Sequence, residues 1–197
     1  MAALDARWAS AWTPVQVTRR LAGISTPWYV AGGWALDLFR GSQTRKHADI
    51  EIAIPAESFP EVRMRLGEYA FDAVDGDRIW ADATSDVLAA THQTWMREPA
   101  TGRYLLDVFR EARDGDLWIC RRDETIRLPY SEIIRHTEDG IPYLAPEQVL
   151  LFKAKYLRRK DQADFDATLP RMTRDQRENL AVLLARVHPG HRWLAAL

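Results

Sequence analysis

The sequence has few of the features that mark exported or membrane-bound proteins. It contains one cysteine, Cys120, among 197 residues. A lone thiol cannot form an internal disulfide, and in an apolar run it is more typical of a buried residue than of a reactive one. No window approaches the ~18 consecutive apolar residues of a membrane span. Asp5 and Arg7 stand where a signal peptide would be apolar. We therefore expect a cytoplasmic protein without a membrane partner.

An excess of either charge is also missing, because 27 basic residues face 28 acidic ones and the net charge is −1. No long-range field then draws the chain towards nucleic acid, so a nucleic-acid partner is not expected. Internal repeats and low-complexity tracts are absent as well. With 47% hydrophobic residues, the chain is long enough to bury a core. We expect a globular monomer or homodimer.

A strand, a diglycine turn and a helix are predicted near the N-terminus. Residues 28–31 form a short apolar run, and residues 34–40 have helical character. Between them lie Gly32 and Gly33, whose missing Cβ atoms would let the backbone approach a phosphate at the start of a helix. Alone, this pair of glycines is more often only an ordinary tight turn.

Three acidic residues lie in or beside apolar strands. In residues 49–54 three isoleucines alternate with Asp49, Glu51 and an alanine, so the two carboxylates leave one face of a strand ~7 Å apart. Asp107 lies within the apolar strand predicted over 104–109, which could neighbour the first. A carboxylate in such surroundings loses solvation energy unless something compensates it. A shared metal site would compensate all three.

Carboxylate oxygens suit Mg²⁺, which keeps some waters and takes phosphate oxygens as further ligands. Two such ions can activate an attacking hydroxyl and neutralise a leaving pyrophosphate. The order of the motifs therefore predicts a nucleotide site, with Asp49, Glu51 and Asp107 as metal ligands and catalytic groups.

The strings Ala31-Gly32-Gly33, Asp49-Ile50-Glu51-Ile52 and Leu106-Asp107-Val108 together resemble the nucleotidyltransferases of the polymerase-beta type. The match is specific from Val30 to Ile54 and loose thereafter. Within that stretch, Gly32-Gly33-Trp34-Ala35-Leu36-Asp37 and Thr44-Arg45-Lys46-His47-Ala48-Asp49-Ile50-Glu51 resemble the antibiotic-modifying branch, the aminoglycoside 2''-adenylyltransferases and lincosamide nucleotidyltransferases. Glu51 is a departure, because these relatives carry Asp there.

The resemblance implies an α/β nucleotidyltransferase fold, a mixed twisted sheet with flanking helices. It implies transfer of a nucleoside monophosphate, AMP from ATP or its counterpart from another NTP, to a hydroxyl of an aminoglycoside or lincosamide-like antibiotic. Two Mg²⁺ ions would be held by Asp49 and Glu51. Asp107 would act as general base, as a third metal ligand, or as both.

Basic residues near the acids are further candidates for the nucleotide site. Arg45 and Lys46 could neutralise the triphosphate, or could form a solvated turn. Lys153, in a predicted lysine-rich helix over 151–161, could reach the phosphates across a cleft. The alternative for Lys153 is pairing with Asp161 and Asp164.

Two residues of the same region are not placed among the nucleotide-binding groups. His47 is expected to orient its loop by a hydrogen bond rather than to bind metal. Asp37 is placed outside the site, because an acid one turn into a helix stabilises it regardless of function. Among the 8 tryptophans, the candidates for an acceptor pocket are Trp34, Trp80 and Trp95.

A switch from strands to helices near Tyr143 divides the chain into a predicted nucleotidyltransferase domain, 1–142, and a helical unit, 143–197, with the site between them. One alternative function is a toxin-type or regulatory nucleotidyltransferase that acts on tRNA or protein, although a large polyanion would favour a more basic surface. Another is a nucleotide-binding module without catalysis. The presence of all three acids speaks against that reading.

Overall fold

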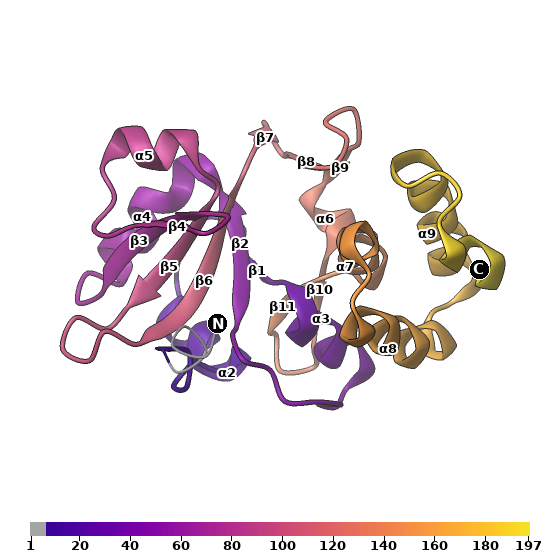
Figure 1. The fold of residues 1–197 in the computed structure, drawn as a ribbon, viewed down its shortest axis with the longest axis horizontal. Coiled ribbons are helices and arrows are strands. Elements are labelled where there is room, and N and C mark those ends of the chain that lie inside the picture. Colours follow the sequence, from indigo (N-terminus) through magenta and orange to yellow (C-terminus); the bar gives the residue numbers. More distant parts are fainter. Residues whose placement is uncertain (1–6) are drawn as a thin grey trace.

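A computed structural model describes residues 7–197 of the chain (Figure 1). Asp5 lies outside the described residues. No helix in the described part is both long enough and apolar enough to cross a bilayer. The strands are β1 (Tyr29–Val30), β2 (Glu51–Pro55), β3 (Ala70–Asp75), β4 (Arg78–Trp80), β5 (Gln93–Arg97), β6 (Tyr104–Glu111), β7 (Arg113–Asp114), β8 (Leu117–Ile119), β9 (Arg127–Pro129), β10 (Ile134–His136) and β11 (Pro142–Leu144).

Longer helices and short 3-10 turns alternate with these strands. The helices are α2 (Pro14–Arg20), α3 (Gly32–Arg40), α4 (Phe59–Arg65), α5 (Ser85–Ala90), α6 (Tyr130–Ile133), α7 (Pro146–Lys153), α8 (Arg159–Thr168) and α9 (Arg174–Val187). The 3-10 turns are η1 (Ala56–Ser58), η2 (Ala154–Tyr156), η3 (Leu169–Arg171) and η4 (Arg192–Ala196).

The main sheet has eight strands in the order β10-β11-β1-β2-β6-β5-β3-β4. At its centre β2 runs parallel to β6, whereas β1 is antiparallel to β2 and β5 is antiparallel to β6. Strands β7, β8 and β9 form a separate small sheet. The mixed sheet with flanking helices confirms the predicted fold class. It also places the predicted acid-bearing strands side by side, with Glu51 opposite Asp107.

The alternation predicted for β2 separates an apolar face from an acidic one. Ile50, Ile52 and Ile54 are buried in a cluster with residues of α2 and α4, such as Val17 and Val62. Because side chains alternate along a strand, Glu51 must leave the opposite face. The helices α2 and α4 therefore cover one side of the sheet and leave the acids on the other.

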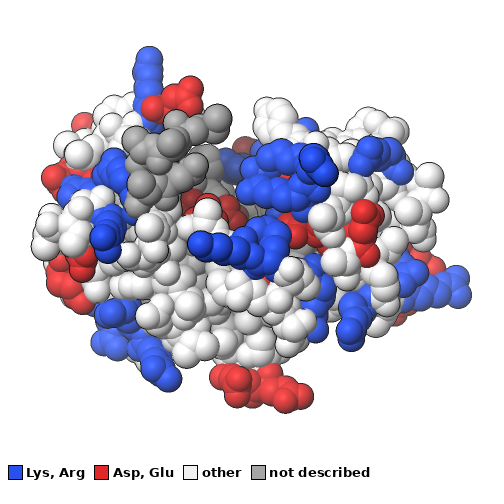
Figure 2. All heavy atoms as spheres, turned by 60° about the horizontal axis from the view of Figure 1, so that its bottom comes forward, with Lys and Arg blue, Asp and Glu red and all other residues white. Residues whose placement is uncertain are grey.

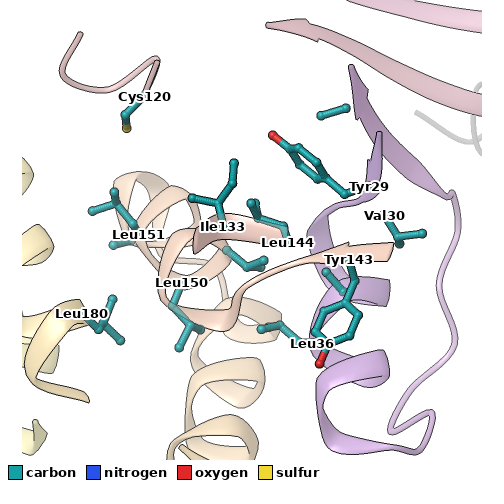
Figure 3. Packing of buried hydrophobic residues seen from close by; sticks show 14 of the residues in the cluster. Tyr29, Val30, Leu36, Cys120, Ile133, Tyr143, Leu144, Leu150, Leu151 and Leu180 are labelled. Atoms are coloured by element: carbon teal, nitrogen blue, oxygen red, sulfur yellow. The ribbon is translucent and has the colours of Figure 1, made fainter. Parts of the chain in front are cut away.

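A second apolar cluster holds α3, α7, α8 and α9 to the edge of the sheet (Figure 3). Tyr29 and Val30 of β1 lie in it with Leu150 and Leu151 of α7, and Cys120, just after β8, is buried in it as expected. The predicted domain boundary at 142/143 falls inside β11, which pairs with β1. Since the cluster contains residues from both sides of that boundary, the division into domains stays a prediction.

The prediction of one continuous lysine-rich helix over 151–161 is wrong. Helix α7 ends at Lys153, the 3-10 turn η2 follows, and α8 begins at Arg159. The carboxylate of Asp161 accepts a hydrogen bond from the backbone N–H of Arg158, 3.1 Å away, and so caps a new helix. The break thus falls between Tyr156 and Arg159, and Tyr156 is exposed.

Candidate nucleotide-binding site

The diglycine lies within the first turn of α3 rather than in a turn before it, a correction to the sequence-based prediction. Gly32 has a φ of +60°, which non-glycine residues rarely adopt. A Cβ on Gly32 would lie 1.4 Å from Oε2 of Glu51, and one on Gly33 would lie 2.4 Å from Nη2 of Arg45. A side chain at either glycine would therefore force a neighbouring side chain to move away from the helix start.

Glu51 and Asp107 are neighbours across the parallel pair of β2 and β6. The side chain of Asp107 is buried, and its Oδ2 accepts a hydrogen bond from Nε2 of Gln93 at 2.6 Å. Its other oxygen, Oδ1, is buried without a hydrogen-bond partner among the described residues. An unpaired buried carboxylate oxygen is destabilising unless a ligand compensates it.

Asp49 lies one residue before Ile50 and just outside β2, so it is not part of the strand as predicted. Its backbone oxygen accepts a hydrogen bond from Nε1 of Trp34 at 3.1 Å, and Asp49 lines the same cavity as Glu51. Within residues 7–197 the three acids are not gathered into a ready-made group of three metal ligands. Their assignment as metal ligands stays a prediction.

The electrostatic environment raises the pKa of both strand acids. Burial and the neighbouring Glu51 raise the pKa of Asp107 well above its usual range. Burial, with a further contribution from Asp49, raises the pKa of Glu51 to about 7, although Lys153 and Lys160 oppose the shift. Like charges held close together in a desolvated site disfavour each other's ionisation. A divalent cation would reverse this, and the hard oxygen donors present suit Mg²⁺.

Asp37 organises the loop that follows α3, a role that the sequence analysis did not assign to it. Its buried carboxylate accepts hydrogen bonds from Arg40, from the backbone N–H of Thr44 at 3.1 Å, and from the His47 ring, 2.5 Å away. The ring of His47 also stacks on Trp34, with 4.5 Å between ring centroids. The expectation that His47 orients its loop by a hydrogen bond is confirmed.

Two of the predicted nucleotide-binding cations are paired with one buried acid. Nε and Nη2 of Arg45 each lie 3.0 Å from a carboxylate oxygen of Asp164, and Nζ of Lys153 lies 2.9 Å from Asp164 and 3.2 Å from Asp161. Arg45 and Lys153 still line the cavity. Lys46 is exposed and is not among the lining residues.

Arg158 and Lys160, which the sequence analysis did not single out, also line the cavity beside Gly32 and Glu51. The sequence shows that both residues lie in a basic run. It does not show the break between α7 and α8, which turns them towards the acids. In Figure 2, Lys and Arg side chains border a hollow in which acidic side chains are visible.

The cavity, of about 270 Å³, is lined by Asp49 and Glu51 but not by the buried Asp107, and it extends to Phe109 and Glu111 of β6. Phe109 and Glu111 occupy the second and fourth positions after Asp107, so all three side chains share one face of the strand. Glu111 accepts hydrogen bonds from the Tyr29 hydroxyl and from Nε1 of Trp118, the latter at 2.7 Å. Burial raises the pKa of Glu111. This period-two pattern after Asp107 was the signal that sequence reasoning missed.

A parallel strand pair that carries opposed acids, beside a helix that begins with two glycines, is the arrangement of the nucleotidyltransferase fold. A structure of the lincosamide antibiotic adenylyltransferase LnuA with lincomycin bound has a TM-score of 0.57 and 18% identity, and the match covers 80% of this chain and 95% of that chain. ANT(2'')-Ia in complex with adenylyl-2''-tobramycin has a TM-score of 0.59 and 13% identity, with 87% of this chain and 95% of that chain covered. At these identities the likeness concerns the fold.

Sequence comparison points to one branch of that fold. Residues 15–90 match the family model of the aminoglycoside-2''-adenylyltransferases. A 2''-aminoglycoside nucleotidyltransferase of Escherichia coli is 32% identical over 81 aligned residues, which cover 32% of this chain and 46% of the relative. The chain thus spans a little under half of the curated relative. The matched segment contains Gly32, Gly33, Asp49 and Glu51, and it confirms the predicted resemblance to the antibiotic-modifying branch.

Proposed function

We propose that the chain is a nucleotidyltransferase that moves a nucleoside monophosphate, AMP from ATP, onto a hydroxyl group of a small molecule. The observation that carries this proposal is the pair Glu51 and Asp107, which lie side by side on parallel strands and form no ion pair among residues 7–197; Glu51 also adjoins Gly32. The acceptor class that the similar proteins suggest is an aminoglycoside or lincosamide antibiotic, because their names describe such substrates.

In the proposed reaction, the oxygen of the acceptor hydroxyl attacks the α-phosphorus of the NTP in line with the leaving group. A new P–O bond forms, the bond between the α-phosphorus and the bridging oxygen breaks, and pyrophosphate leaves with that oxygen. The hydroxyl proton passes to the ionised carboxylate of Asp107, a form that bound cations would favour. When bound, Mg²⁺ ions would supply charge neutralisation at the phosphates.

The remaining residues of the site bind and position the nucleotide in this proposal. Asp49 and Glu51 would hold the metal ions, and the backbone at Gly32 and Gly33 would face the phosphates at the start of α3. Arg158 and Lys160, exposed at the rim of the cavity, add positive charge close to Glu51. Arg45 and Lys153 would add positive charge to the same cavity while they remain paired with Asp164.

The test combines binding with turnover. Each NTP is titrated into the protein with Mg²⁺ by calorimetry, and pyrophosphate release is then followed with a panel of aminoglycosides, lincosamides and other hydroxylated acceptors. We expect saturable binding of ATP that depends on Mg²⁺, and we expect pyrophosphate release with at least one acceptor. The proposal fails if no NTP binds in the presence of Mg²⁺ and none is consumed.

The variant Asp49→Asn tests the metal-binding assignment, with the exposed Asp139→Asn as a matched control. We expect Asp49→Asn to reduce turnover by more than tenfold, equivalent to about 1.4 kcal/mol in the barrier, with an unchanged circular dichroism spectrum. Turnover within tenfold of wild type would show that Asp49 does not hold the metal.

A further inference from the structure

The far end of the cavity carries a second group of cationic side chains, separate from those near the acids. Arg121 and Arg122 line the cavity together with His92, Phe109 and Glu111. The two arginines follow β8, whereas the cations that influence Glu51, which include Lys153 and Lys160, come from α7 and α8. One cavity thus has two basic ends, and only one of them adjoins the diglycine.

Neither arginine at the far end is neutralised. Arg121 and Arg122 form no ion pair with any acid among residues 7–197. Nε of Arg122 is buried without a hydrogen-bond partner among the same residues, and its guanidinium lies over the ring of Phe152, 5.4 Å from the centroid. The other two arginines that line the cavity behave differently, since Arg45 and Arg158 each have an aspartate partner.

The other titratable groups at this end offset the two positive charges only in part, because Glu111 attracts Arg121 but forms no ion pair with it. The guanidinium of Arg121 donates a hydrogen bond to Nε2 of His92, whose pKa is lowered to about 4 by burial and by Arg121 itself, so the ring is neutral. Glu111 is the one acid lining this part of the cavity, and its Oε2 already accepts from Tyr29 and Trp118. Burial also raises the pKa of Glu111.

An apolar floor lies between the reaction centre and the arginines. Phe109 is half-buried, and its ring lies parallel to that of His92 with 5.9 Å between centroids. Because alternate residues of a strand are ~7 Å apart, a ring lying across Phe109 could present a hydroxyl towards Glu51 and the proposed reaction centre at one end and a charged group to Arg121 and Arg122 at the other.

We propose that the acceptor is a hydroxylated small molecule with an acidic group, a carboxylate or a phosphate, which Arg121 and Arg122 bind while its ring packs on Phe109. This inference rests on the proposed nucleotidyl transfer. An aminoglycoside carries several protonated amines at neutral pH and would meet unpaired guanidinium groups here. Guanidinium groups instead match carboxylate and phosphate oxygens in geometry as well as in charge.

A series of hexoses with the same ring tests the charge preference: glucose, glucuronate, glucose 6-phosphate and glucosamine, with kanamycin as a polycation. Each is titrated by calorimetry into the full chain with Mg²⁺ and a non-hydrolysable ATP analogue at pH 7.5. We expect glucuronate or glucose 6-phosphate, or both, to bind at least tenfold more tightly than glucose, and kanamycin to bind more weakly than either acid. Which acid binds better distinguishes a carboxylate from a phosphate subsite.

The double variant Arg121→Gln/Arg122→Gln should lose the preference for acids over glucose, whereas Arg127→Gln, an exposed arginine paired with Asp114, should keep it. The inference is overturned if neither acid binds more tightly than glucose, if kanamycin binds most tightly, or if the double variant retains the preference. A separate titration of ATP with Mg²⁺ and no acceptor tests the proposed function. Failure of that titration is therefore distinct from failure of the acceptor inference.

Discussion

Replacing Glu51 by glutamine should stabilise the protein when no cation is bound. The pKa of Glu51 is about 7 in the folded chain, against 4.5 for an ordinary glutamate. The folded state therefore holds its proton to higher pH than the unfolded state, and ionisation of Glu51 lowers the free energy of unfolding as pH rises through this window. From these two values the loss is about 1 kcal/mol at pH 5 and about 3 kcal/mol at pH 8.

Glu51→Gln removes this charge and nearly preserves the side-chain volume. Its gain in free energy of unfolding over wild type should be about 3 kcal/mol at pH 8 and about 1 kcal/mol at pH 5. Urea denaturation in EDTA at the two pH values measures it, with the exposed Glu138→Gln as a control that should change little at either pH. Added Mg²⁺ should then stabilise wild type more than the Glu51→Gln variant, because the cation binds the charged form.

The reasoning is refuted if Glu51→Gln destabilises the cation-free protein at pH 8. A gain of the same size at both pH values would also refute it, because that result would come from packing rather than from ionisation.

Two further substitutions test the supports of the site. Asp164→Asn should lower the free energy of unfolding by about 3 kcal/mol in urea denaturation, because Arg45 and Lys153 lose their shared buried carboxylate. A loss below about 1 kcal/mol would mean that these two ion pairs add little to the stability of the fold. Gly32→Ala should weaken Mg²⁺-dependent ATP binding at least tenfold in calorimetry, because its Cβ would displace the Glu51 carboxylate. Gly102 also has a positive φ (+69°), but a Cβ there would meet no other atom within 4 Å, so Gly102→Ala should leave ATP binding unchanged. Equal effects of the two glycine variants would contradict the proposed displacement of the Glu51 carboxylate.

Features that depend on local pattern were predictable from the sequence. The alternation of residues 50–54 predicted both the buried isoleucines and the acid on the opposite face. The helix caps are equally local, since Thr13 and Gln16 form a capping box at the start of α2, and Thr173 and Gln176 form one at the start of α9. The hydrophobic pattern of residues 104–109 placed Asp107 in a strand. Each of these follows from a period or a cap that a few neighbouring residues determine.

Features that depend on distant partners were not predictable. Arg45 and Asp164 are 119 residues apart in the chain, and nothing local to Arg45 indicates that a buried carboxylate will hold it. The interruption after Lys153 depends on Asp161, which caps α8 and also pairs with that lysine. Similarly, the sequence did not show that the room beside Gly32 is taken up by Glu51.

The same-face residues of β6 explain how chemistry and acceptor preference can vary separately in this site. Asp107 lies opposite Glu51 and belongs to the proposed reaction centre, where a changed charge would disturb the proposed metal binding and proton transfer together. Phe109 and Glu111 lie farther along the same face and touch groups that have no part in holding the nucleotide, such as His92 and Trp118. A substitution at 109 or 111 would therefore alter the surface offered to the acceptor and leave the acids in register. If the proposed reaction holds, this spacing would let one strand keep the reaction while changes at positions 109 and 111 alter the acceptor, within a fold similar to that of aminoglycoside and lincosamide adenylyltransferases.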